Sequence, residues 1–183
     1  MNRKHCLAIL AAAALSMNCF ASPAWAGELP AAVQTKVDKA KKYLVQLAAN
    51  PVVVAAVRES NTRDAADMTN GKWLDLNEAD PYVKAILTSK VSTMIAKWEK
   101  DDDTVNKILL RDQKGRLVGA SVRPLLYNNA SRPVFANALK GQVWAADEIK
   151  PDTSTQIPSV HVSVPVLDGG KPIGVLHAGV TAN

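Results

Sequence analysis

Apolar residues in the first part of the chain recur with a helical period. Between Ala31 and Leu47, every third or fourth residue is apolar and lysines occupy several positions between them, a pattern that predicts an amphipathic helix. The next segment, PVVVAAVRES, starts at Asn50-Pro51, an N-cap residue followed by a proline suited to the first helical turn. Its β-branched residues would also suit a strand, but the Asn-Pro start and the alanines favour a second, short helix.

A polar segment separates these helices from a further apolar stripe. Residues 61–79 are mostly polar, and Trp73 and Leu74 are the apolar pair expected to anchor them. An Asp-Pro start then opens a run whose apolar residues fall on one helical face as far as Trp98. The pattern predicts one helix that begins at Pro81 and places Trp98 in the core.

Beyond residue 105 the apolar period changes to two, the spacing of β-strands. KILLRD and RLVGAS flank a Gln-Lys-Gly turn, and SVHVSVPVL and KPIGVLHAGVT flank Asp-Gly-Gly, so that each pair predicts a β-hairpin. Between the two hairpins, a short helix is predicted from Pro133 to Lys140 and is ended by Gly141. The segment QVWAADEI then predicts a further strand.

The order of these elements predicts an α+β fold. Helices come first and strands follow, so we expect the long N-terminal helix or helices to pack on one face of the sheet. Two hairpins and one further strand make a central five-stranded, mostly antiparallel sheet. The 183 residues leave room for one domain.

Residues 1–26 have the features of a cleaved signal peptide. A basic pair precedes an alanine-rich apolar run that ends in AWA at 24–26, a small-x-small cleavage site. The run is too short and too rich in alanine for a convincing membrane helix. We therefore expect residues 27–183 to form an exported domain in the periplasm. Lipid attachment at Cys19 is the alternative, although Asn18 is larger than the residue that lipidation needs at that position.

Removal of this segment narrows the chemistry available to the rest of the chain. Both cysteines, Cys6 and Cys19, lie in it, so the remainder has no disulfide, thiolate metal site or cysteine nucleophile. The 22 Lys and Arg residues fall to 20, against 17 Asp and Glu, once Arg3 and Lys4 are removed. No basic stripe favours nucleic acid as a partner. The acidic run at 101–103 is interpreted as a solvated helix end or loop, because adjacent carboxylates do not converge on one metal ion by themselves.

No motif in the sequence indicates an enzyme. Gly-x-Ser-x-Gly, His-Glu-x-x-His, a glycine-rich phosphate loop and the Cys-x-x-Cys-His haem site are all missing from the sequence. We therefore expect a protein that is not an enzyme and that carries no cofactor and no metal.

Three motifs in a fixed order resemble one family. LLRDQKGRLVGAS, ANALKGQVW and HVSVPVLDGGKPIGVLHAGV follow one another with a spacing similar to that of extracytoplasmic Cache (PAS-like, PDC) sensor domains. These are the ligand-binding modules of bacterial chemoreceptors and sensor kinases. The resemblance covers nearly all of the chain after the signal peptide, and it implies a PAS-like sheet that binds a small molecule.

A finer resemblance lies in YNNASRPVFANA. Amino-acid-sensing Cache domains have a Tyr, an Arg five residues later, an aromatic pair and a later Asp, which here correspond to Tyr127, Arg132, Val134 with Phe135, and Asp152. The resemblance implies that the guanidinium grips a carboxylate, the acid holds an ammonium group and the aromatic residues form walls. Valine at 134 removes one wall and phenylalanine at 135 removes a hydroxyl, which puts an α-amino acid as the ligand in doubt.

Each of these residues also has a purely structural interpretation. Arg132 begins a helix and could lie at the surface, Tyr127 could pack half-buried, and Asp152 could cap a turn in its Ser- and Thr-rich loop. Trp144 lies in a predicted strand, and we expect it in the core or in a pocket wall.

The two histidines of the closing hairpin are predicted to lie on opposite faces of the sheet. A tight turn at Asp-Gly-Gly places His177 opposite Val162 and His161 opposite Ala178, and neighbouring positions alternate in direction. His177 is then a packing residue on the apolar face. His161 is a candidate pocket residue, since it resembles the position at which dicarboxylate-sensing relatives place an arginine. One β-bulge would reverse this assignment.

The leading hypothesis is a free-standing periplasmic sensory or binding protein. It would bind a small organic metabolite, an amine, an amino-acid-like compound or a carboxylate, and signal through a separate membrane-bound protein, since the final strand IGVLHAGVTAN runs to the end of the sequence. The alternative is a ligand-free interaction module that keeps the Cache fold. In that case the N-terminal helix would pair with a partner or with a second copy, as a homodimer.

Overall fold

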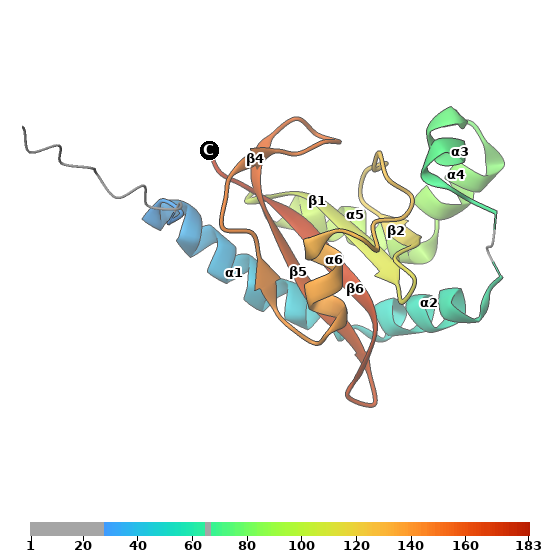
Figure 1. The fold of residues 1–183 in the computed structure, drawn as a ribbon, viewed down its shortest axis with the longest axis horizontal. Coiled ribbons are helices and arrows are strands. Elements are labelled where there is room, and N and C mark those ends of the chain that lie inside the picture. Colours follow the sequence, from blue (N-terminus) through green and yellow to red (C-terminus); the bar gives the residue numbers. More distant parts are fainter. Residues whose placement is uncertain (1–27, 65–66) are drawn as a thin grey trace, which may run out of the picture.

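The computed structural model describes residues 28–64 and 67–183 (Figure 1). The predicted signal peptide, residues 1–26, lies outside the described residues. The helices are α1 (Ala31–Ala48), α2 (Pro51–Thr62), α3 (Asn70–Asp75), α4 (Pro81–Leu87), α5 (Lys90–Asp101) and α6 (Pro133–Leu139). The strands are β1 (Val105–Asp112), β2 (Leu117–Ala120), β3 (Trp144–Ala145), β4 (Lys150–Pro151), β5 (Pro158–Asp168) and β6 (Lys171–Thr181).

The strands form one antiparallel sheet whose two long central strands are β6 and β5. The order across the sheet is β2-β1-β6-β5-β3, and the short β4 pairs with a different part of β5. The predicted α+β class, with helices on a mostly antiparallel sheet of about five strands, is confirmed. Both predicted hairpins, β1–β2 and β5–β6, are present. The strand predicted from QVWAADEI is reduced to the two residues of β3.

Local capping explains where the helices begin. Asn50 caps α2 by accepting a hydrogen bond from the backbone N–H of Val52 at 2.9 Å, as its sequence predicts. The prediction of one unbroken helix from Pro81 to Trp98 is wrong, because the chain leaves the helical conformation at Thr88. Ser89 then caps a new helix, α5. A short hydroxyl side chain competes with the helical backbone for hydrogen bonds, which favours a break at this point.

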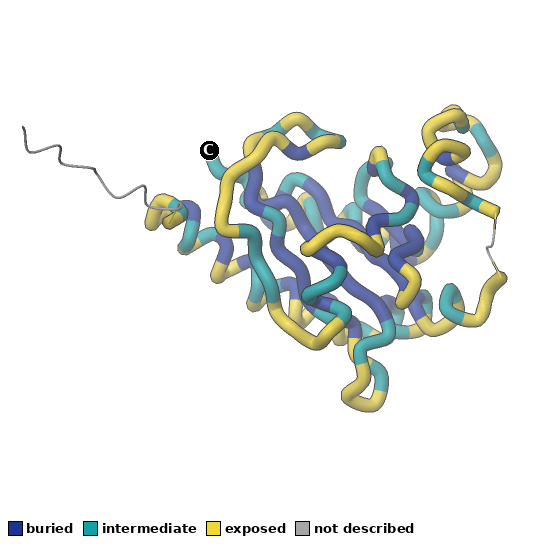
Figure 2. Tube along the Cα trace, viewed as in Figure 1, coloured by how far each residue is buried: buried dark blue, intermediate teal, exposed yellow. Residues whose placement is uncertain are grey.

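The main core lies between the sheet and helices α1, α2 and α5. Figure 2 shows the sheet as the buried centre of the molecule, with exposed loops at its margins. Fully buried valines of β5, among them Val160, Val162 and Val164, face the apolar stripe of α1. Trp73 is completely buried, whereas Leu74 is 55% exposed, so only one member of the predicted anchor pair is buried. Among the described residues, no helix is long and apolar enough to cross a membrane.

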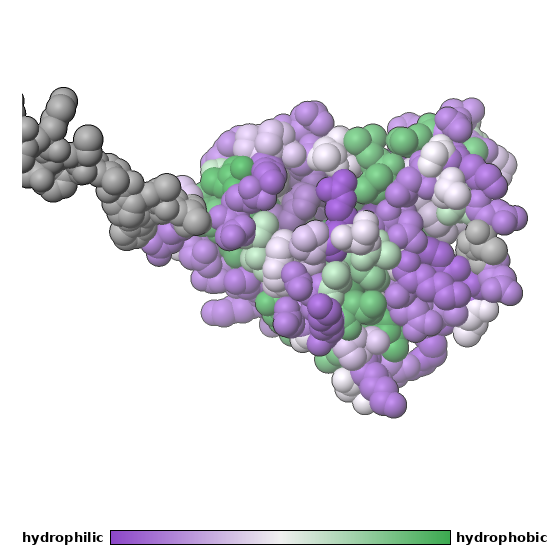
Figure 3. Space-filling model, in the orientation of Figure 1, coloured by the Kyte–Doolittle hydropathy of each residue, from purple (hydrophilic) through white to green (hydrophobic). Residues whose placement is uncertain are grey.

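The opposite face of the sheet is covered by α6 and by two loops, residues 121–132 and 152–157. In Figure 1, α6 lies over β5 and β6 on the side away from α1. Figure 3, in the same orientation, shows hydrophobic patches beside α6 and over the loop that precedes it, with hydrophilic residues between the two patches. The candidate site lies under this cover.

A β-bulge in the closing hairpin changes the register that the sequence suggested. Gly169 and Gly170 make the turn with positive φ angles of 55° and 82°. Between Val166 and Leu167 the pairing then shifts, because Ile173 of β6 is inserted without a partner in the ladder. The Ile173 carbonyl instead accepts a hydrogen bond from Asn61 Nδ2 at 2.8 Å.

This shift brings the two histidines of the hairpin to the same face. His161 pairs with Gly179, and His177 pairs with Ser163, each one position away from the predicted partner. The prediction that the histidines lie on opposite faces, with His177 in the apolar core, is therefore wrong. Both point away from α1, toward the face that α6 covers.

Candidate functional site

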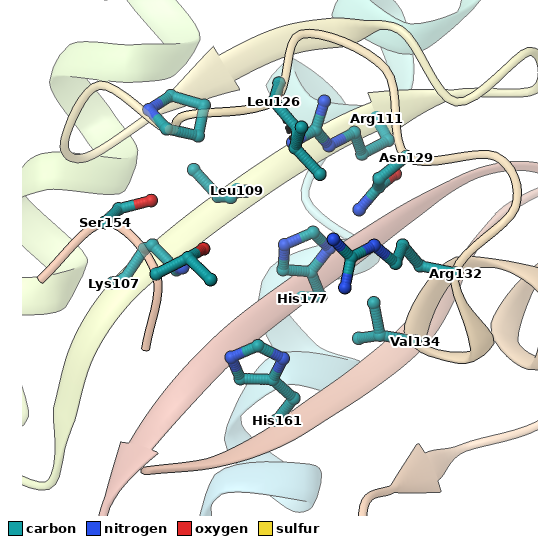
Figure 4. Close-up of a pocket in the computed structure, with 12 residues that line it drawn as sticks. Lys107, Leu109, Arg111, Leu126, Asn129, Arg132, Val134, Ser154, His161 and His177 are labelled. Carbon is teal, nitrogen blue, oxygen red and sulfur yellow. Dashed lines mark hydrogen bonds between the residues drawn. The ribbon is translucent and has the colours of Figure 1, made fainter. Parts of the chain in front are cut away.

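A cavity of about 80 Å³ lies between the sheet and its cover of α6 and loops. Figure 4 shows side chains from three strands, from two loops and from the start of α6 pointing into it. Its walls are formed by twelve residues: Lys107, Leu109, Arg111, Pro124, Leu126, Asn129, Arg132, Val134, Thr153, Ser154, His161 and His177.

The strands give this cavity a basic floor. Lys107 and Arg111 lie four residues apart on β1, so the alternation of the strand directs both to the same face. β5 and β6 add His161 and His177, and the start of α6 adds Arg132. None of the twelve lining residues is acidic. The described wall therefore attracts negative charge.

Asp152 lies behind the wall and holds two of the basic side chains in place. The carboxylate is fully buried; its Oδ2 forms an ion pair with Lys107 Nζ and contacts His161 Nε2 at 2.9 Å. Its Oδ1 accepts hydrogen bonds from the backbone N–H groups of Ser154 and Thr155, at 2.8 and 3.0 Å. Burial alone would raise the pKa of Asp152, but the hydrogen bonds from His161 and Lys107 and the charge of Lys107 outweigh it and hold that pKa far below its usual range.

Lys107 is the cationic half of this buried pair. Burial lowers the pKa of Lys107, and the hydrogen bond and charge of Asp152 partly restore it. The two groups therefore form a nearly neutral unit, because each compensates the charge of the other. Arg111 has no such partner.

Arg111 is a buried cation without a carboxylate. It is 1% exposed, and no salt bridge involves it among the described residues. Its guanidinium donates to the backbone carbonyl oxygens of Tyr127 and, at 2.9 Å, of Leu126, which leaves Nε without a partner. The neighbouring Asp112 pairs with Arg116 instead. Burial lowers the pKa of Arg111 to about 9.

Unpartnered buried polar atoms gather at this cavity. Among the described residues, four buried side-chain atoms lack a hydrogen-bond partner: Arg111 Nε, Asn129 Oδ1, Ser163 Oγ and His177 Nδ1. Three of them belong to lining residues, and Ser163 pairs directly with His177 across the two strands. Buried polar groups nearly always have a partner, so this concentration is typical of a site that hydrogen-bonds a bound molecule.

The stability of the ligand-free protein is expected to fall as the pH drops from 7 to 5.5. Burial, followed by the charges of Arg111 and Lys107, lowers the pKa of His177 well below the usual 6.5. The unfolded chain then takes up a proton below pH 6.5 that the folded protein does not bind, which lowers the free energy of unfolding by up to ~1.4 kcal/mol per pH unit. Urea unfolding across this range measures the slope. His177→Asn should flatten it, and an equal slope in the variant would contradict the assignment.

The structure brings three of the sequence-predicted site residues to the cavity. Arg132 and His161 line it, and Asp152 lies directly behind His161 and Lys107. The side chain of Tyr127 instead packs with Trp73, and its hydroxyl lies 2.8 Å from that of Tyr82. Only its backbone carbonyl reaches the cavity wall, through Arg111.

The remaining two predicted residues are not among those that line the cavity. Phe135, a residue of α6, is buried with Ala138 and Val175, and Trp144 is half-buried in β3. Most of the polar wall comes from residues that the sequence motifs did not indicate: Lys107, Arg111, Asn129 and His177. The sequence does carry a signal for the first two, since Lys107 and Arg111 alternate in phase with Leu109 in the strand VNKILLRD.

Comparison with solved structures finds sensor and ligand-binding domains at low similarity. No family model and no curated protein matches the chain. The sensor domain of the V. cholerae histidine kinase DctB is similar, with 14% identity and a TM-score of 0.44 over 82% of this chain and 57% of that one. The sensory domain of the Campylobacter jejuni chemoreceptor Tlp3, with isoleucine bound, has 14% identity and a TM-score of 0.43 over 81% of this chain and 62% of that one.

The ligand-binding domain of the Pseudomonas fluorescens chemoreceptor CtaA, in complex with L-alanine, is a further similar structure. It has 14% identity and a TM-score of 0.37 over 82% of this chain and 56% of that one. The chain thus spans about three fifths of the length of these sensor domains. All three TM-scores are below 0.5, and the candidate binding chemistry rests on the cavity itself.

Proposed function

We propose that this protein is an extracytoplasmic sensory or ligand-binding domain that captures a small carboxylate in the cavity between β1, β5, β6 and α6. The observation that carries the proposal is Arg111, a buried guanidinium that lines the cavity and, among the described residues, has no carboxylate partner and no acceptor for Nε. A carboxylate that accepts from this group supplies the missing negative charge and the missing acceptor at once.

The wall favours a carboxylate over an amine. An ammonium group needs an acceptor, and the nearest buried carboxylate, Asp152, already receives Lys107, His161 and two backbone N–H groups. A carboxylate instead meets Arg111 on β1 and Arg132 at the start of α6. Of the ligand classes considered from the sequence, the carboxylates therefore fit best.

The size of the cavity favours a compact molecule. Sites for drug-sized ligands occupy roughly 300–1,000 Å³, whereas this cavity has about 80 Å³. Leu109, Leu126 and Val134 supply apolar wall for a short carbon chain, and Asn129 Oδ1 can accept from a hydroxyl group. Carboxylates of two to four carbons are the candidates.

We further propose that occupancy is reported to a membrane-bound signalling protein. The export signal predicted at residues 1–26 would place the domain outside the cytoplasm.

Pairing of two copies through α1 stays a prediction. The outward positions of that helix, including Asp38, Lys39 and Lys42, are exposed and mostly polar. A contact there would be more polar than a coiled-coil seam.

Thermal-shift screening of the purified protein tests the proposal. Acetate, lactate, pyruvate and succinate are expected to raise the melting temperature of the wild type, whereas amines of similar size should leave it unchanged. Arg111→Met should weaken carboxylate binding by roughly 10- to 100-fold, the value of a charge-assisted hydrogen bond. Arg58→Met is the matched control, since Arg58 is an exposed arginine that pairs with Asp168. Equal binding by wild type and Arg111→Met, or selective binding of amines, would contradict the proposal.

A further inference from the structure

We infer that His177 is a direct contact of the bound anion and that it takes up a proton when the anion enters, so that affinity for carboxylates rises as the pH falls. The inference rests on the proposed function, because it concerns the same cavity. It assigns to His177 a ligand-binding and proton-accepting role, where the sequence indicated packing.

The position of His177 makes it a contact residue. It lies in the middle of β6, is 4% exposed, and lines the same cavity as Arg111 and Arg132 (Figure 4). Its Nδ1 has no hydrogen-bond partner, and neither has Ser163 Oγ on the paired position of β5. A carboxylate can only accept hydrogen bonds, so a contact with this ring requires an N–H at the ring nitrogen that faces the anion.

The charges around His177 explain why the proton arrives with the ligand. The elements around it present these charged or titratable groups: Lys107 and Arg111 from β1, His161 from β5, Asp152 from the loop that precedes β5, and Arg132 from the start of α6. In the ligand-free site the basic groups oppose a further positive charge, and burial acts in the same direction, which lowers the pKa of His177.

A bound carboxylate reverses this balance. In the described part of the chain, Asp152 is the carboxylate that acts on the ring, and its charge is already compensated by Lys107. A second carboxylate beside Arg111 neutralises that cation and favours the imidazolium form of His177. Anion binding therefore promotes protonation. By reciprocity, protonation promotes anion binding to the same extent.

His161 is the other imidazole in the wall, and its surroundings differ. Its Nε2 lies 2.9 Å from Asp152 Oδ2, and its side chain is 37% exposed. A carboxylate partner and access to water are thus present before any ligand binds. The arrival of an anion changes the environment of His161 less than that of His177, which has neither.

Calorimetric titration tests the inference on the purified wild-type protein. Lactate and pyruvate are the probes, because their carboxyl groups stay ionised between pH 5.5 and 7.5, and each is titrated in buffers of different ionisation enthalpy. The apparent enthalpy is expected to depend on the buffer, with between about half and one proton taken up per bound anion near pH 6.5. The Kd should fall by up to about tenfold per pH unit as the pH is lowered.

Two matched variants assign the proton to one ring. His177→Asn keeps an amide close to the position of Nδ1 but removes the titration, so binding should persist without proton uptake and with a Kd that is independent of pH. His161→Asn should retain the proton uptake of the wild type.

The possible results separate the role of His177 from the proposed function of carboxylate binding. Saturable binding without proton uptake by the wild type would overturn the role of His177 and leave the proposed function in place. Uptake that persists in His177→Asn, or disappears in His161→Asn, would also overturn it, since the proton would then belong to another group. If neither probe nor any other small carboxylate gives saturable heat in the wild type, both claims fail together.

Discussion

Replacing Asp152 with alanine is expected to lower the free energy of unfolding by about 3–5 kcal/mol, because it leaves Lys107 as an uncompensated charge in the protein interior. The change also removes the acceptor of two backbone N–H groups and the partner of His161. Urea unfolding at pH 7 measures the loss. The same variant should lose carboxylate binding, since Lys107 and His161 are no longer held in the cavity wall.

Two comparisons separate the buried charge from other effects of this substitution. The double variant Lys107→Met/Asp152→Ala should recover roughly half of the lost stability, because the stranded cation is gone while the backbone donors remain unpaired. Asp147→Ala, at a nearby exposed position, should change stability by less than ~0.5 kcal/mol. A loss below about 1 kcal/mol in Asp152→Ala would show that water reaches Lys107 and that the pair is not a buried one.

The pH dependence of the stabilisation by Asp152 follows from the direction in which the pKa of its carboxyl group is shifted. The pKa of Asp152 is held far below the usual 3.8, so the unfolded chain binds a proton first as the medium becomes acidic. The stabilisation is complete at pH 7 and is lost as the pH falls below about 4. In Asp152→Ala this acid-dependent loss should be smaller than in the wild type.

The amino-acid sequence predicts correctly those helices and strands whose signals, such as caps and turns, are local in the chain. Asn50 caps the helix that its Asn-Pro start indicated, and both hairpins follow from period-two runs around glycine turns. The break between α4 and α5 was missed, because the apolar stripe continues across it and only the cap at Ser89 marks it. Tertiary contacts decide such a choice, since the pattern of apolar residues suits either one helix or two.

The prediction of the candidate site depended on the register of the closing hairpin, where a shift of one residue decides which face His177 occupies. The bulge at Ile173 inverts the face of His177, and the Asn61 side chain that satisfies the Ile173 carbonyl comes from α2, more than one hundred residues earlier in the chain. Nothing close to Ile173 in sequence predicts this contact. The motif resemblance selected Arg132, which lines the cavity, and Asp152, which contacts Lys107 and His161 of its wall.

The basic floor of the cavity could have been suspected from the sequence. Lys107 and Arg111 stand in phase with Leu109 inside the strand VNKILLRD, and a central strand covered on both faces has no solvent for either charge. Charged residues at buried strand positions need a partner, an ion or a ligand. What the sequence could not supply is which one: Asp152 partners Lys107, and Arg111 has no carboxylate partner.

Replacing Trp73 with alanine is expected to lower the free energy of unfolding by about 3–5 kcal/mol. The side chain is completely buried, its ring centroid lies 5.7 Å from that of Tyr127, and the Arg123 guanidinium lies 4.9 Å above it. Its indole N–H donates to the Pro124 carbonyl at 2.8 Å. Trp73→Phe keeps part of the packing but loses this hydrogen bond, and should cost about 1–2 kcal/mol. Leu74→Ala, at the neighbouring exposed position, is the control, with an expected change below ~0.5 kcal/mol.

The effect of Trp73 should extend to the ligand, because this residue holds the loop that closes one side of the cavity. Pro124 and Leu126 line the cavity, and the carbonyl groups of Leu126 and Tyr127 orient Arg111. Loosening the loop at Trp73 therefore misplaces the guanidinium without removing it, and the affinity of Trp73→Phe for lactate should fall severalfold while the variant remains folded. An unchanged affinity together with the expected loss of stability would show that Arg111 is oriented by its own strand, and the role of the loop would be limited to stability.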